Sequence, residues 1–170
     1  MNIFVTSPCP EESALVLPDQ HIKKMPIECC QMLAFVASPH VHNYGQLPKK
    51  DGTPYMTRKN SPHLKHPCTL WAAKSIHNAQ WLIYHGFMLC EEYFRRYGKQ
   101  IACYDTLLRA FELFPDGDFN KITPFIRAMP DPLKLNDAID TFTAYKLYIA
   151  SKPWVSDDYK RLPSRKPNWL

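Results

Sequence analysis

A polar stripe with helical spacing at residues 19–37 constrains this 170-residue chain more than any other feature. The stripe consists of four residues three or four positions apart: His21, Lys24, Glu28 and Gln31. The apolar residues of the segment fall mostly on the opposite side, which predicts a core helix with one wet face. Because Pro26 lies inside the segment, we expect the helix to kink or restart there.

Glu28 is the first candidate for chemistry on this stripe, since a carboxylate on an otherwise apolar helix can move protons. The alternative is structural. If the helix restarts at Pro26, Glu28 lies in its opening turn, where the helix dipole favours a carboxylate by about 0.3–1 kcal/mol. His21 has a similar alternative as a hydrogen-bonded structural histidine, and Lys23 and Lys24 as solvated surface charges.

The rest of the chain also predicts helices, and we expect an all-α fold in which residues 1–170 form one compact helical bundle. The short opening stretch 1–5 is apolar and β-prone. Thr69 is expected to cap a long apolar helical region that ends at Gly98, with a break near His77 and Asn78. The other expected helices cover residues 11–17, 100–114 and 137–151. Residues 38–67 predict a long irregular loop and residues 152–170 an extended tail.

The net charge of +5 is moderate, but its distribution is uneven. The loop carries five cations, and Asp51 is its only acid; the cations are Lys49, Lys50, Arg58, Lys59 and Lys65. With its interleaved histidines and tyrosines, such a loop suits phosphate contacts and base stacking. A solvated loop without a partner explains the charge equally well. The basic, Trp-containing tail can clamp across the domain or contact nucleic acid, and for Trp154 we expect structural docking.

Six cysteines lie largely within apolar patterns, so we expect buried free thiols. His63, His66 and Cys68, with Cys29 or Cys30 added, match no common zinc spacing, and we expect neither a metal nor a cofactor. No apolar run is long enough to cross a bilayer and the opening residues lack signal-peptide features, which predicts a soluble cytoplasmic protein with no membrane partner. Gly-rich phosphate loops and nucleophile elbows are absent from the sequence.

The stretch Leu17-Pro18-Asp19-Gln20-His21 through Glu28 resembles the pyrimidine-dimer DNA glycosylases of the phage endonuclease V type. That family carries a similar Asp-Gln-His block and a catalytic glutamate seven residues after the histidine, which here falls on Glu28. Asn60-Ser61-Pro62-His63 and the tail motif Arg165-Lys166-Pro167-Asn168-Trp169 resemble further family motifs in the same order. The opening Met-Asn-Ile-Phe-Val and the block Ala128-Met129-Pro130 are also similar to small phage proteins of no assigned function, which would place the chain in an infected bacterial cytoplasm.

The resemblance implies an all-α DNA glycosylase, with or without AP-lyase activity, that acts on damaged or modified, double-stranded DNA. Its N-terminal α-amine would attack the sugar C1′ and form an imine, while Glu28 would stabilise charge and move protons. The implied catalytic set is Glu28, His21 and an amine on Met1 or Asn2. The expected nucleic-acid contacts are Lys23, Lys24, Arg58, Lys59, Lys65, Arg165, Lys166 and Trp169.

Two departures from the family pattern affect this interpretation. The family exposes a small residue when its initiator methionine is removed, whereas Asn2 is a poor context for that removal. Either Met1 itself supplies the amine or the lyase chemistry is lost. Ile27 and Gln31 stand where the family has arginines, so phosphate contacts must come from elsewhere. Two alternatives stay open: a non-catalytic phage protein that binds nucleic acid or a host protein, and an enzyme that acts on a modified nucleotide.

Overall fold

The computed structural model describes all residues from 1 to 170, and its regular structure is entirely helical, as the sequence predicts. No strand forms, and the only β-type pairing is an isolated bridge between Pro48 and Pro54. The helices are α1 (Pro10–Leu15), α2 (Asp19–Ala37), α3 (Pro67–Lys74), α4 (Ile76–Tyr97), α5 (Tyr104–Leu113), α6 (Asp131–Lys134) and α7 (Thr141–Ala150). Three short 3₁₀ turns cover Phe119–Lys121, Val155–Asp157 and Pro163–Arg165.

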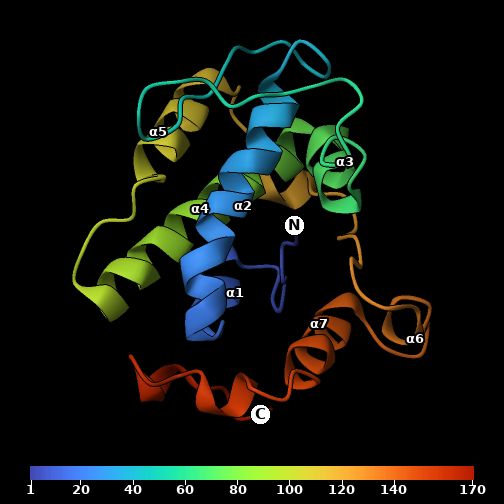
Figure 1. Ribbon diagram of the computed structural model, residues 1–170. Helices are drawn as coiled ribbons and strands as arrows, with labels where there is room; N and C mark the ends of the chain where they lie inside the picture. The colour runs from blue at the N-terminus through green and yellow to red at the C-terminus, as the bar shows by residue number, and fades with distance from the viewer.

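Helices α2 and α4 cross at the centre of the molecule, with the N-terminal segment beside them (Figure 1). One cluster of 35 buried apolar residues joins these elements to α3, α5 and α7. Gly86 lets α4 pack closely against α2 and α5, because a Cβ atom at this position would lie only 2.7 Å from Leu107 Cδ2 and 3.4 Å from Cys29 Cβ. The three helices therefore meet in a tightly packed junction.

Helix α2 runs through Pro26 without a restart. Proline removes one backbone hydrogen bond and costs an exposed helix about 3 kcal/mol. Here Pro26 is buried and the apolar side of α2 packs against α4, so burial offsets that cost. Glu28 consequently lies well inside a continuous helix, and the opening-turn explanation for its carboxylate is wrong.

Several helix boundaries differ from the sequence prediction. Helix α3 begins at Pro67, where Nδ1 of His66 accepts a hydrogen bond from the Cys68 N–H and caps the helix. Thr69 lies inside α3 and is buried, so it is not the cap. The break before α4 falls at Ser75, whose hydroxyl caps the new helix, rather than at His77 or Asn78.

Gly98 ends α4 in the left-handed conformation, with φ +65°, as the sequence predicts. Helix α5 starts at Tyr104 rather than Gln100. Helix α7 starts at Thr141, after Asp140, which accepts a hydrogen bond from the Thr143 N–H, so the expected start at Asp137 is four residues early. The start of α7 is thus shifted to the residue that can cap it, whereas no side chain caps the start of α5.

The loop between α2 and α3 is irregular, as expected, and runs over one end of the bundle (Figure 1). The tail after α7 runs along the opposite end (Figure 1). Tyr159 is buried and its hydroxyl donates to the Val16 carbonyl at 2.6 Å. The Asp19 N–H donates to the Asp158 carbonyl at 2.7 Å, so the tail is bonded directly to the start of α2.

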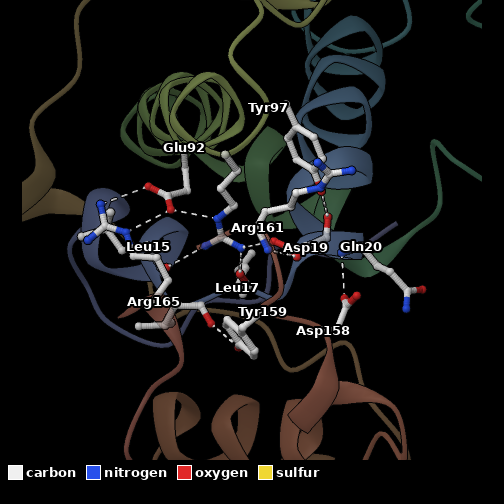
Figure 2. Close-up of polar contacts among 12 residues, drawn as sticks. Leu15, Leu17, Asp19, Gln20, Glu92, Tyr97, Asp158, Tyr159, Arg161 and Arg165 are labelled. Atoms are coloured by element: carbon white, nitrogen blue, oxygen red, sulfur yellow. Dashed lines mark hydrogen bonds and ion pairs between the residues drawn. The ribbon is translucent and has the colours of Figure 1, made fainter. Parts of the chain in front are cut away.

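A buried charge network fixes this junction. Arg96 of α4 pairs with Glu92 at 2.9 Å and with Asp19 at 3.1 Å, and it also donates to the Leu15 and Leu17 carbonyls. Figure 2 shows Arg165 and Arg161 of the tail reaching the same carboxylates. Arg165 pairs with Glu92 at 3.0 Å, and the Arg161 backbone N–H donates to Asp19 at 3.0 Å.

We predict that Arg96→Ala destabilises the protein by about 3–5 kcal/mol, because it leaves two buried carboxylates without their common partner. Arg109→Ala is the control, since Arg109 pairs with Glu112 on the exposed surface and its loss should cost about 1 kcal/mol or less. Urea unfolding measures both. Equal, small losses for the two variants would contradict the assigned role of Arg96.

Candidate active site

The carboxylate of Glu28 contacts the first two backbone nitrogens of the chain, one through a hydrogen bond and one through an ion pair. Its Oε2 atom lies 2.9 Å from the Asn2 nitrogen, which donates a hydrogen bond, and 3.7 Å from the Met1 α-amine. Its Oε1 atom lies 3.2 Å from Lys24 Nζ, one helical turn earlier. The Glu28 side chain is only 9% exposed, so these partners compensate a charge that would otherwise be costly to bury.

The side chain of Asn2 holds the N-terminal segment in this position. Its Nδ2 atom donates to the Ala128 carbonyl at 2.7 Å, and its Oδ1 atom accepts from the N–H groups of Ile3 and Phe4. The Met1 side chain is 2% exposed although the residue as a whole is half-buried, so its accessible surface lies mainly on the main chain that bears the amine. The amine is thus held between the hydrogen-bonded Asn2 and its own buried side chain.

Phe4 follows with a positive φ of +40°, a conformation rare for a bulky residue. Its ring stacks on His21 at 4.1 Å between centroids and on Tyr148 at 5.9 Å. Trp154 of the tail meets the His21 ring edge-on at 5.6 Å. Strained backbone of this kind persists where the surroundings enforce it and is concentrated near functional sites.

His21 is buried within this aromatic cluster, and its Nδ1 atom has no hydrogen-bond partner. Burial is the main cause that lowers its pKa to about 4, and the positive charges of Lys152 and Lys24 add to the shift. The ring is therefore neutral at pH 7. His21 shares a helix face with Glu28, but its environment does not suit a cationic proton donor.

The expected DNA-contacting residues lie in three places. Lys23 and Lys24 are exposed on α2, and Arg58, Lys59 and Lys65 are exposed on the loop between α2 and α3. In the tail, Arg165 is paired with Glu92, Lys166 donates to the Ser156 carbonyl at 3.1 Å, and Trp169 is half-buried against the core.

The structure adds Tyr97 to the basic end of α2, a residue that the sequence analysis missed. Lys23 and Arg161 both lie over the Tyr97 ring, at 5.7 and 5.2 Å from its centroid. In the sequence, Tyr97 lies in the last turn of an expected core helix. Only the fold brings it beside two cations from distant segments. Together the three side chains form a ridge of positive charge next to the start of α2.

A cavity of about 510 Å³ lies between α2, the loop that follows it and the start of α5, and neither Met1 nor Glu28 is among its lining residues. Ile27 and Gln31 of α2, Lys49 and Lys50 of the loop, and Cys103 are among its lining residues. The polar face of α2 therefore leads from the aromatic cluster, past Glu28 and the chain's first nitrogen, to a cavity with a basic wall.

All six cysteines are free thiols, and five are buried, as the sequence predicts. No three His, Cys, Asp or Glu side chains lie in an arrangement that could hold a metal ion. None of the helices combines the length and apolar character that a bilayer crossing requires.

Comparison with known proteins identifies one family. The family model for pyrimidine dimer DNA glycosylase matches residues 1–105, which is more than half of the chain and includes α1 to α4 with the Met1, Asn2 and Glu28 cluster. No curated protein and no solved structure matches the chain.

Buried neutral histidines predict acid sensitivity. Burial lowers the pKa of His21 and of His85 from 6.5 to about 4 in the folded protein, so below pH 6.5 the unfolded chain binds more protons. The unfolding free energy should fall by about 2 kcal/mol per histidine between pH 6.5 and roughly pH 5, and stay constant above that window. His21→Gln should remove the His21 share of this fall in unfolding free energy and leave the share of His85. His40→Gln, at an exposed histidine, should leave the whole fall unchanged. Unfolding free energies without a pH slope in this range would contradict the prediction.

Proposed function

The chain belongs to the pyrimidine dimer DNA glycosylase family, and from that premise we propose that it attacks the damaged nucleotide with its N-terminal amine, assisted by Glu28. Family membership makes it a DNA-acting enzyme that cleaves the bond between a base and its sugar. The proposal adds a mechanism with AP-lyase activity and a duplex substrate that carries a damaged or modified base.

The approach of an α-amine to a buried glutamate is the observation that carries the proposal. Met1 N lies 3.7 Å from Glu28 Oε2, and the Glu28 side chain is only 9% exposed. An α-amine loses its proton more readily than a lysine side chain, which favours it as a nucleophile near neutral pH. The anchored Met1 side chain limits the orientations of the amine and so favours attack.

The proposed reaction begins when the neutral amine attacks C1′ of the sugar. The C1′–N bond to the base breaks, and the base leaves with the bonding electrons and takes up a proton. Opening of the sugar ring gives an imine between the chain and C1′. A carboxylate beside the amine can then accept the C2′ proton, which allows β-elimination of the 3′ phosphate. Glu28 is placed next to the amine and fits that role.

Met1 is our candidate for the residue that bears the amine, with Asn2 as the alternative. The buried Met1 side chain and the poor context that Asn2 gives for methionine removal favour Met1. If methionine were removed, the Asn2 nitrogen, 2.9 Å from the same oxygen, would become the amine. Intact mass of the natural protein distinguishes the two.

For duplex binding we propose the exposed cations of α2 and the loop as phosphate contacts: Lys23, Lys24, Arg58, Lys59 and Lys65. Lys166 and the half-buried Trp169 extend this surface along the tail. Arg165 contributes chiefly by anchoring the tail to Glu92, because its guanidinium is already paired. We propose that neutral His21 holds Phe4, and so the N-terminal segment, rather than transferring protons.

Borohydride trapping tests the amine. With duplex DNA carrying an abasic site or a pyrimidine dimer, the reduced imine should give a covalent protein–DNA adduct. A matched protein with extra residues before Met1 moves the amine away from Glu28 and should lose at least about 100-fold in adduct yield. Equal yields from the two proteins would contradict the role of the N-terminal amine, while base release without any adduct would leave a glycosylase without lyase chemistry.

Glu28→Gln tests the carboxylate. The amide keeps the size of the side chain but cannot accept a proton, so turnover should fall by about 10²–10⁴-fold while duplex affinity changes little. Glu112→Gln, at an exposed carboxylate paired with Arg109, is the control for charge removal and should keep full activity. Wild-type turnover in Glu28→Gln would assign Glu28 a purely structural role.

Salt dependence tests the phosphate contacts. Replacing Lys23 or Lys59 with Gln should weaken duplex binding regardless of sequence and reduce the slope of log affinity against log salt by about one each. Lys134→Gln, on α6, is the control and should leave the slope unchanged. An unchanged slope in the first two variants would remove these lysines from the binding surface.

A further inference from the structure

Three buried thiols from three helical elements meet beside the cavity. Cys30 lies on α2, Cys90 on α4, and Cys103 immediately before α5. Cys30 Sγ donates to the Cys103 carbonyl at 3.5 Å, and the side chains of Cys30 and Cys90 both adjoin that of Cys103. The proposed DNA chemistry uses none of these sulfurs.

The three thiols are unequal. The neighbouring thiols of Cys30 and Cys90 stabilise a thiolate on Cys103 and lower its pKa well below the usual range, whereas contact with Cys103 and burial raise the pKa values of Cys30 and Cys90. The thiolate is the reactive form of cysteine. Cys103 is therefore the nucleophilic member of the cluster, with two protonated thiols in contact with it.

Only Cys103 of the three lines the cavity. A volume of about 510 Å³ admits small molecules, and the wall around Cys103 includes Ala102, Thr106 and Tyr55. Cys30 and Cys90 are 0% and 1% exposed and lie behind it. A reagent from solvent thus reaches Cys103 first, and a thiol that can react with the product lies next to it.

We propose that Cys103 is a peroxide-sensitive modification site and that Cys30 converts the oxidised sulfur into a reversible disulfide. The oxidant class is a small hydroperoxide such as hydrogen peroxide, which fits the cavity. Cys30 is the resolving thiol because its Sγ lies 3.5 Å from the Cys103 carbonyl, a hydrogen bond that Cys90 does not make.

The proposed disulfide forms in two steps. The Cys103 thiolate attacks one peroxide oxygen, the O–O bond breaks, and hydroxide leaves and is protonated to water, which leaves a sulfenic acid on Cys103. The Cys30 sulfur then attacks the Cys103 sulfur, the S–O bond breaks, and the hydroxyl leaves with the Cys30 proton as water. One peroxide is reduced to two waters overall, and two thiols are oxidised to one disulfide.

The disulfide would link α2 to the start of α5. Cys30 lies two residues after Glu28, so the cross-link would restrain the helix that carries the carboxylate. A thiol or dithiol reductant would restore the open form. The inference concerns residues outside the proposed catalytic set, so it stands or fails independently of the glycosylase mechanism.

Peroxide titration of the full-length reduced protein tests the site. Stoichiometric hydrogen peroxide should remove two of the six alkylatable thiols, and peptide mapping should place the disulfide between Cys30 and Cys103. Cys30→Ser should instead accumulate sulfenic acid at Cys103 and raise dimedone labelling there several-fold. Cys9→Ser is the control, since Cys9 is a half-buried thiol on α1's cap outside the cluster, and should leave the disulfide unchanged.

Three results would overturn the proposal: retention of all six thiols at peroxide excess with the fold intact, a disulfide mapped to a different pair, or dimedone labelling at Cys9 but not at Cys103 in Cys30→Ser. The wild-type map alone decides the first two, so the proposal is tested even if a cysteine variant fails to fold.

Discussion

The contact between the Glu28 carboxylate and the beginning of the chain is the interaction on which the candidate site depends. A carboxylate that is only 9% exposed needs partners, and it has the Asn2 N–H, the Met1 amine and the Lys24 ammonium. The same contact fixes the first residues, which form no helix or strand of their own. One buried charge thus both orders the N-terminus and places its amine beside a proton acceptor.

Distant parts of the chain support this contact. Asn2 is bonded to Ala128, more than 120 residues away, and the start of α2 is bonded to the tail through Asp19 and Asp158. Arg165 of the tail is paired with Glu92 of α4 (Figure 2). Because Glu28 is rigidly carried by α2, any loosening of these tail contacts should be transmitted to the amine.

The sequence predicted the all-helical fold and the helix that carries Glu28, because periodicity and residue type are local properties. The expected wet face of α2 is wrong in part, since His21 and Glu28 are buried under distant segments and only Lys24 of the stripe is exposed. It misplaced the starts of α3, α5 and α7. For α3 and α7 the capping side chain, His66 or Asp140, depends on three-dimensional context, while α5 starts without a side-chain cap. It also gave no reason to connect Tyr97 with Lys23 and Arg161, or Asn2 with Ala128, since those pairs arise only from packing. The role expected for Arg165 illustrates the same limit: its charge suggested DNA, whereas the fold pairs it with a buried glutamate.

The most direct measurement is to locate the covalent bond in a borohydride-trapped complex by mass spectrometry of the digested protein. Lys24 makes this measurement decisive. Its side-chain nitrogen lies 3.2 Å from Glu28 Oε1, so Lys24 is the other amine next to Glu28 that could attack the sugar. We predict a sugar remnant on the α-nitrogen of the first residue of the natural protein. A remnant on the side chain of Lys24, with the α-amine unmodified, would contradict it.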